Sequence, residues 1–347
     1  MGLLRMLFAL SVALTHSGIR PPVNATLAVR FFFTISGFYM AMVLDGKYAP
    51  TAEGIKKFYG NRLLRLLPSY YISLLVAIAV IVAVGSSQGN FYSGFWQGMQ
   101  ELGASAKAAV VAAQAFVFGQ DALLFTVVKD GGLVYTSNFG AAPRDQQTWV
   151  HTLNPPAWSL SIELLFYCFV PFLARLKTRT LFIGMLVTLA IRLACAKVVP
   201  IMQDPWDYRF FPFEISTFMA GMVGYRIYRH GGWKQYVPEN FRKFAPWALA
   251  ILCLVLQKAP FSSLWLPYLF IALLPTMFEA CKKVVWDRKI GDFSYPVYII
   301  HWPIVQLFKH LGFAHANWAG VIVVVAVSVV LFNFVELPID RLRQRLV

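Results

Sequence analysis

The chain has 347 residues, of which 58% are hydrophobic, 16% aromatic and 14% charged, with a mean hydropathy of +0.60. This composition excludes an ordinary soluble domain, whose core needs fewer apolar residues, and it predicts a polytopic membrane protein. The net charge of +15 does not indicate nucleic-acid binding, because Lys and Arg gather in short runs between apolar segments, as topology signals do.

Eleven apolar stretches have roughly the length of a bilayer-crossing helix, which is about 17–25 residues. They are residues 3–17, 28–44, 68–85, 104–128, 157–174, 180–199, 211–228, 244–258, 263–280, 293–310 and 318–335. If residues 104–128 do not cross, every basic cluster falls on the cytoplasmic side, as the positive-inside rule requires.

We therefore predict an all-α, polytopic membrane helical bundle of about ten transmembrane helices with both termini cytoplasmic. Residues 86–156 are expected to form an extracytoplasmic segment that contains an interfacial or re-entrant helix. We expect residues 1–347 to be a single integral-membrane domain, so that any chemistry lies inside the bundle.

The first stretch carries Arg5 and His16, which lie eleven residues apart, on one helix face and about 16 Å from each other along the axis. Ionisable groups at membrane depth are costly and usually functional. Arg5 can hold a phosphate at the cytoplasmic mouth, and a neutral His16 can accept a hydroxyl proton. Alternatively, Arg5 is a topological anchor and His16 a hydrogen-bonded core residue. A signal peptide is a further alternative, but the apolar run before Ala13 is too short for one.

The second stretch opens with Arg30 and continues through Ser36 and Gly37. Arg30 either snorkels to the interface or faces the bundle as a charge, where it would bind an anionic acceptor or an oxyanion. Ser36 lies near mid-membrane beside Gly37, and this pairing favours close helix packing over a nucleophilic role.

The segment KFYGNRLLRLLPSYY reads as an amphipathic cytoplasmic helix that leads into the next crossing at Pro68. Arg62 and Arg65 are spaced i, i+3 and can clamp one anionic group together. Contact with lipid headgroups is the alternative.

Ser159, Glu163 and Tyr167 form a polar stripe on the apolar segment AWSLSIELLFYCFV. A carboxylate there needs a partner or a proton. Glu163 is expected at a depth similar to that of His16, so that it could orient the imidazole. The alternative is a structural ion pair with Arg30 or Arg192.

A second stripe, in FSYPVYIIHWPI, contains Ser294, Tyr298 and His301. His301 either lines a cofactor tunnel or is a satisfied core histidine, and Glu214 carries the same ambiguity. The chain shows no His, Cys or carboxylate spacing typical of a metal site, so we expect no metal. The four cysteines are interpreted as packing residues without a disulfide.

These segments together resemble the membrane-bound acyltransferase-3 family. The resemblance spans nearly the whole chain and rests on six motifs in the family's order, which are Arg5 with His16, RFFFTISGF, Arg62 and Arg65 before Pro68 and Tyr70, WSLSIE with Trp158 and Glu163, YPVYIIHWP with Tyr298, His301 and Pro303, and VELP with Glu336 and Pro338. In that family about ten helices move an acyl group from cytoplasmic acyl-CoA to an acceptor, often a sugar, on the other side.

The resemblance implies that His16 is catalytic and that Arg5, Arg62 and Arg65 serve the CoA moiety. We expect acetyl-CoA as donor, a carbohydrate or glycan as acceptor, and a place in the bacterial inner membrane. We add Glu163 as a second predicted catalytic residue and His301 as a predicted cofactor-binding residue. The predicted acceptor contacts are Arg30, Ser36, Trp158 and Tyr298.

Two other classes of function remain open from the sequence. A transporter or flippase would also carry polar groups inside a bundle, although no half-to-half symmetry is evident. A non-catalytic partner in polysaccharide assembly is the other.

Overall fold

The computed structural model describes residues 1–84, 91–93, 95–313 and 315–345, and helices make up most of them, which confirms the all-α class. The helices are α1 (Gly2–His16), α2 (Ala25–Gly46), α3 (Ala52–Val84), α4 (Phe95–Glu101), α5 (Ala104–Phe116), α6 (Trp158–Leu173), α7 (Thr178–Cys195), α8 (Phe211–His230), α9 (Glu239–Leu256), α10 (Ser262–Cys281), α11 (Val285–Asp292), α12 (Ser294–Leu311), α13 (Ala316–Leu331) and α14 (Leu337–Arg345). Each of the eleven apolar stretches contributes a helix.

Six helical segments of the described chain are long and apolar enough to cross a membrane. They are Ala25–Gly46, Ala52–Val84, Pro155–Leu173, Thr178–Cys195, Ser262–Cys281 and Ala316–Gln344, while α1 and α5 are apolar but shorter. The segment 104–128 is α-helical only to Phe116, which is too short for a bilayer, and a single 3-10 turn follows at Ala122–Phe125. The number of ten crossings and the sidedness of the termini stay predictions.

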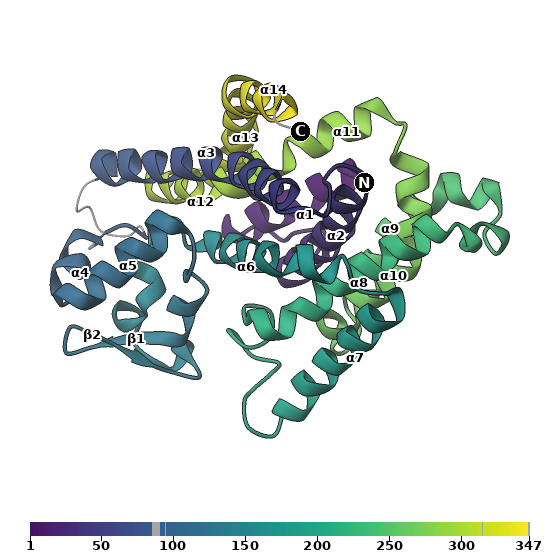
Figure 1. The fold of residues 1–347 in the computed structure, drawn as a ribbon. Coiled ribbons are helices and arrows are strands. Elements are labelled where there is room, and N and C mark those ends of the chain that lie inside the picture. The colour runs from purple at the N-terminus through teal and green to yellow at the C-terminus, as the bar shows by residue number, and fades with distance from the viewer. Residues whose placement is uncertain (85–90, 94, 314, 346–347) are drawn as a thin grey trace.

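The centre of the bundle is the crossing of α2 and α8, where the two backbones touch (Figure 1). A Cβ atom on Gly37 would come within 2.0 Å of the Phe218 carbonyl oxygen, and one on Gly221 within 1.8 Å of the Thr34 carbonyl oxygen. Glycine therefore sets the distance between these helices, since any side chain would force them apart.

Residues 95–154 fold into a lobe beside the bundle, at the left of Figure 1. The lobe contains α4, α5 and an antiparallel hairpin of β1 (Thr126–Lys129) and β2 (Gly132–Tyr135). Its two-residue turn is Asp130-Gly131, with φ of 49° and 72°, as a type I′ turn requires. The Tyr70 hydroxyl of α3 anchors the lobe by donating to the Gln114 carbonyl oxygen at 2.6 Å.

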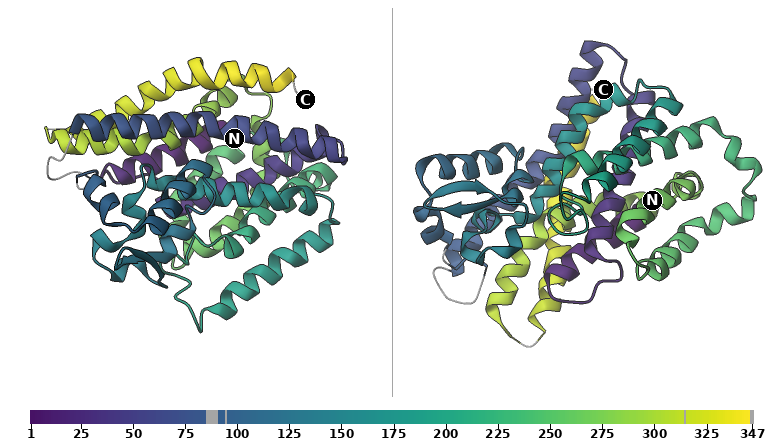
Figure 2. Two further views of the ribbon diagram at one scale, coloured as in Figure 1. Left: turned by 60° about the vertical axis from the view of Figure 1, so that its left-hand side comes forward. Right: turned by 90° about the horizontal axis from the view of Figure 1, so that it is seen from below.

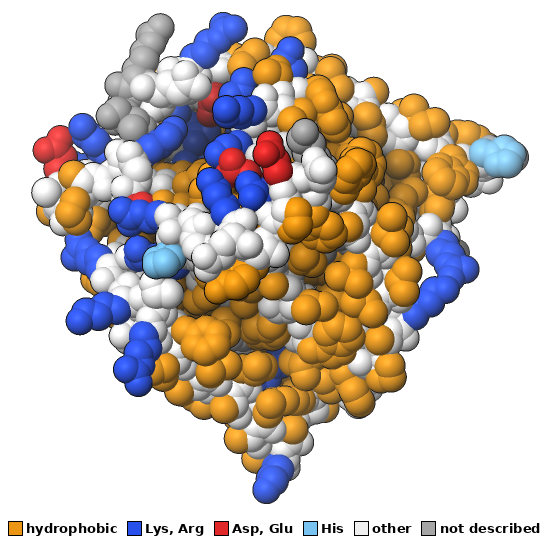
Figure 3. Space-filling view, turned by 90° about the vertical axis from the view of Figure 1, so that its right-hand side faces the viewer, with side chains coloured by type: hydrophobic (Ala, Val, Ile, Leu, Met, Phe, Trp, Pro, Cys, Tyr) orange, Lys and Arg blue, Asp and Glu red, His pale blue; other side chains and the backbone are white. Residues whose placement is uncertain are grey.

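Large apolar side chains remain exposed along the sides of the helices. Val82, Phe172 and Ile322 are 72%, 64% and 66% exposed. Figure 3 shows such side chains forming a broad surface with Lys and Arg at its margins. A surface of this extent is what contact with lipid acyl chains requires.

Both ends of the described chain lie at the same end of the bundle. Arg5 of α1 and Arg65 of α3 both act electrostatically on Asp292 at the end of α11. The C-terminal helix α14 lies against α3, and Figure 2 shows it beside that long helix. This arrangement fits an even number of crossings.

Candidate functional site

Two cavities lie inside the bundle and share a wall. The arginine cavity has a volume of about 250 Å³ and is lined by Arg5, Arg62 and Arg65. The histidine cavity has a volume of about 280 Å³ and is lined by His16. Val29 and Tyr298 line both cavities. Helix α1 thus presents Arg5 to one cavity and His16 to the other, as the spacing of the two residues predicted.

The arginine cavity carries excess positive charge. Arg65 lies 3.5 Å from the Glu336 carboxylate. Within the described part of the chain, no carboxylate lies within 4.0 Å of the charged nitrogens of Arg5 or Arg62. The i, i+3 spacing on α3 therefore does bring Arg62 and Arg65 to one cavity, and a bound anion would be attracted there.

Glu163 lies in the arginine cavity and not beside His16. Its Oε1 accepts hydrogen bonds from Ser36 Oγ at 2.8 Å and from Tyr167 OH at 2.7 Å. The prediction that Glu163 orients the imidazole is wrong, because α6 turns this carboxylate toward α2. The hydrogen bond also gives Ser36 a definite partner, one that the sequence did not suggest.

The partner of His16 is His301 of α12. His16 Nδ1 lies 2.7 Å from His301 Nε2, and His301 Nδ1 lies 2.6 Å from the carbonyl oxygen of Tyr298. A carbonyl oxygen only accepts, so His301 Nδ1 carries the proton, and His301 Nε2 of the neutral ring accepts from His16 Nδ1. This leaves His16 Nε2 as an unprotonated nitrogen on the residue that lines the cavity.

His301 itself lines neither cavity and is fully buried. Burial with both ring nitrogens hydrogen-bonded is what the alternative, a satisfied core histidine, describes. Trp302, the next residue on α12, packs edge-on against His16 with ring centroids 5.1 Å apart and does line that cavity.

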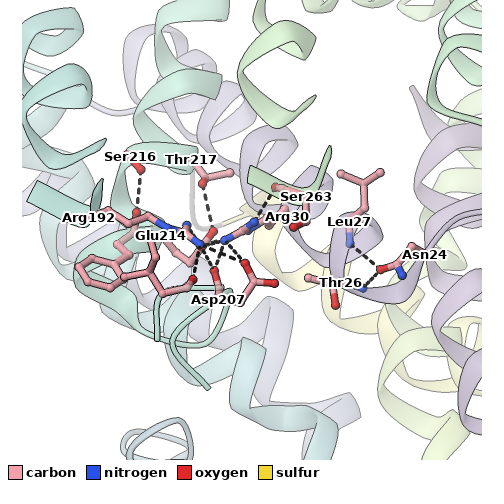
Figure 4. A network of polar contacts seen from close by, with 12 residues as sticks. Asn24, Thr26, Leu27, Arg30, Arg192, Asp207, Glu214, Ser216, Thr217 and Ser263 are labelled. Carbon is pink, nitrogen blue, oxygen red and sulfur yellow. Dashed lines mark hydrogen bonds and ion pairs between the residues drawn. The ribbon is translucent and has the colours of Figure 1, made fainter. Parts of the chain in front are cut away.

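Arg30 lines neither cavity either, which overturns its predicted role in binding the acceptor. It is 1% exposed, and its Nη2 lies 2.8 Å from the Glu214 carboxylate. Arg192 Nη1 lies 3.0 Å from the same carboxylate, and both guanidinium groups bind the carbonyl oxygen of Asp207 (Figure 4). Two arginines and two carboxylates compensate each other, so Arg30 is structural.

Tyr298 and Trp158, two of the predicted acceptor contacts, both line the histidine cavity. The Tyr298 hydroxyl is 2.6 Å from Ser159 Oγ, and this pair stands at the wall between the cavities. Trp158 is 5% exposed and lines the histidine cavity.

The sequence analysis missed Arg209 and its neighbours in the loop between α7 and α8. The Arg209 guanidinium lies over the rings of Trp158 and Tyr208, at 4.6 and 4.7 Å from their centroids. Its Nε lies 2.6 Å from the Asp204 carboxylate, and all four residues line the histidine cavity. A signal was present, since Arg209 is an arginine that the predicted topology leaves outside, against the positive-inside rule.

No group of three potential metal ligands occurs among the residues that the structure describes. The side chains that line the two cavities include an imidazole, guanidinium groups, carboxylates and aromatic rings.

Comparison with known proteins gives one result. The acyltransferase-3 family model, described as an acyltransferase domain, matches residues 1–335. Searches among curated proteins and among solved structures give no match. The resemblance carried by the six motifs is confirmed, and with its apolar helices the chain is an integral-membrane protein. The chain belongs to the acyltransferase-3 family.

Proposed function

We propose that the protein is a transmembrane O-acyltransferase that moves an acetyl or other short acyl group from cytoplasmic acyl-CoA to a hydroxyl of an extracytoplasmic carbohydrate. The observation that carries this proposal is the shared wall of the two cavities. Guanidinium groups line one cavity and an imidazole the other, with Val29 and Tyr298 between them. A donor and an acceptor could thus approach one point from opposite ends of α1.

The arginine cavity suits the donor. Guanidinium groups bind phosphate through charge-assisted and often bidentate hydrogen bonds. Arg5, Arg62 and Arg65 would hold the phosphates of acyl-CoA, and the thioester would extend past Tyr298 toward His16.

The histidine cavity suits a sugar. Aromatic rings such as those of Trp158, Tyr208 and Trp302 offer flat apolar faces for the C–H groups of a pyranose. Asp204 and Arg209 offer an acceptor and donors for its hydroxyl groups. A surface polysaccharide or lipid-linked sugar outside the bacterial inner membrane fits this cavity.

In the reaction, His16 Nε2 would take the proton of the acceptor hydroxyl while the oxygen attacks the thioester carbonyl. The tetrahedral intermediate would collapse with cleavage of the carbon–sulfur bond, and the imidazolium would return its proton to the departing thiolate of CoA. General-base assistance of this kind contributes about 10²- to 10⁴-fold to the rate.

The test is transfer of labelled acetyl groups from acetyl-CoA to the surface glycans of the host by purified protein in nanodiscs. His16→Ala should lower transfer by about 10²-fold or more. His230→Ala is the matched control, because this exposed histidine lies at the end of α8 and lines neither cavity. If His16→Ala transferred acetyl groups at the wild-type rate, His16 would not be the catalytic base. Substrate uptake without consumption of acyl-CoA would decide for a transporter.

A further inference from the structure

The C-terminal helix α14 brings a third arginine to the cytoplasmic end of α3. Arg343 donates to the side-chain oxygen of Asn61 twice, from Nε at 2.8 Å and from Nη2 at 2.7 Å. Arg62 Nη2 donates to the same oxygen at 3.1 Å. Two guanidinium groups therefore converge on one neutral atom, although Arg343 is only 9% exposed.

The positive charge at this point is only partly compensated. Arg343 Nη1 has Asp340 at 2.7 Å, but that carboxylate is 38% exposed and belongs to the same helix turn. Arg62 has no described carboxylate within 4.0 Å, and its buried Nε has no hydrogen-bond partner. Like charges held this close in a partly buried place repel each other, and an anion would relieve the repulsion.

We propose that Arg343 and Arg62 form a phosphate clamp, in which a phosphate of the nucleotide end of the donor takes the place of the Asn61 amide oxygen between the two guanidinium groups. This inference rests on the proposed function, since it assigns a further residue to the donor site. The family match ends at residue 335, and Arg343 lies beyond it on α14.

A lipid headgroup carries the same phosphate chemistry. The position of Arg62 favours the nucleotide, because this side chain lines the arginine cavity and shares the Asn61 side-chain oxygen with Arg343 of α14. One anion bound by both side chains would therefore be continuous with the cavity that receives the rest of the donor.

The experiment titrates adenosine 3′,5′-bisphosphate, which carries phosphates like those of the nucleotide end of CoA, into the full-length protein in nanodiscs of neutral lipid. Arg343→Gln should weaken binding about 10-fold or more, as expected for loss of a charged hydrogen bond. Arg341→Gln is the control, because it removes an equal charge from an exposed position of α14 and should change the affinity less than twofold.

A second variant separates binding from folding. Asn61→Asp places a carboxylate between the two guanidinium groups, so it should raise the melting temperature and weaken bisphosphate binding at the same time. If the clamp were only structural, Asn61→Asp would raise the melting temperature and leave binding unchanged. That result would overturn the proposal even if Arg343→Gln did not fold.

The alternative ligand, a lipid headgroup, is tested by adding phosphatidylglycerol to the same variants and measuring their stability. If phosphatidylglycerol stabilises the wild type but not Arg343→Gln, while both bind the bisphosphate equally, the ligand is a headgroup and the proposal is overturned. If Arg343→Gln binds the bisphosphate more weakly but the wild type transfers no acyl groups, the clamp is supported and the proposed function is rejected. If Arg343→Gln binds the bisphosphate as the wild type does and the wild type transfers acyl groups, the clamp is rejected and the proposed function is supported.

Discussion

His16 gains its chemical character from a residue 285 positions away. His301 Nε2 fixes the proton of His16 on Nδ1, and the Tyr298 carbonyl oxygen fixes the proton of His301 in turn. In the proposed reaction, a chain of two imidazoles ending on a backbone carbonyl would serve the purpose that a carboxylate serves in other acyl-transfer sites, without placing a negative charge in the bundle. His301 would then be a positioning residue.

This arrangement predicts different effects for two substitutions of His301. In His301→Gln the amide oxygen can still accept from His16 Nδ1, so most of the activity should remain. In His301→Leu the acceptor is lost, and kcat should fall about 10- to 100-fold because the tautomer of His16 is no longer fixed. The KM for acyl-CoA should not change, since His301 does not line the arginine cavity.

Steady-state kinetics of both variants, with pH profiles, provide the measurement. His301→Gln should keep the shape of the wild-type profile. A kcat of wild-type size in folded His301→Leu would show that the imidazole pair has no part in the reaction.

At the scale of elements, the α2–α8 contact predicts a strong effect of the smallest possible substitution. Gly221→Ala puts a methyl group against the Thr34 carbonyl oxygen of α2, so the helices must separate. Overpacking of this kind costs about 1–3 kcal/mol, and more where the backbone has to move. Gly46→Ala is the control on α2, because a Cβ there meets nothing within 4 Å.

Thermal unfolding in detergent measures the difference between the two variants. Gly221→Ala should melt well below the wild type, whereas Gly46→Ala should melt close to it. Equal melting temperatures would mean that α2 and α8 do not approach as closely as described.

Asp287 of α11 supplies the N-terminal cap that α1 lacks. Its two oxygens accept from the backbone N–H groups of Gly2 at 2.7 Å and of Leu3 at 2.9 Å. Burial disfavours the charged carboxylate, but these hydrogen bonds and the Met1 ammonium 2.7 Å from Oδ2 outweigh it and hold its pKa below the usual value. The unfolded chain then binds the proton more tightly, so this contribution to stability is present above pH 4 and is lost as pH falls through the folded pKa.

Asp287→Asn should therefore lower the melting temperature at pH 7, by the equivalent of about 1 kcal/mol for a lost cap. The difference in melting temperature between Asp287→Asn and the wild type should disappear as the pH is lowered toward 3. A gap that stays constant over this range would show that the charge of Asp287 does not stabilise α1.

At the scale of the molecule, the predicted sidedness can be tested on exposed positions. In a chain whose four cysteines are replaced by alanine, Ser105→Cys lies on the lobe and Lys57→Cys in a basic cluster of α3. A membrane-impermeant maleimide should label Ser105→Cys in intact cells and Lys57→Cys only after permeabilisation, because basic clusters stay cytoplasmic. The opposite pattern would invert the topology, and with it the direction of acyl transfer.

Much of this molecule follows from local sequence patterns. Apolar stretches of bilayer length predicted eleven helical segments, and the distribution of basic clusters predicted that residues 104–128 do not cross the membrane. The 3.6-residue period placed Arg5 and His16 on one face of α1, and Arg62 and Arg65 on one face of α3. The placement of each pair concerns a single helix, and a single helix is what periodicity describes.

The tertiary structure decided which helix faces which. Glu163 could have met His16 or Arg30 as far as its own helix was concerned, but α6 turns it to Ser36. Arg30 pairs with Glu214 inside the bundle, a partner that its own helix does not indicate. Periodicity gives the direction of a side chain relative to its own axis, whereas the partner depends on how helices far apart in the chain are rotated and how closely they approach. Close packing at glycines sets that approach in α2 and α8, and the packing of α1 against α12 brought His301 to His16.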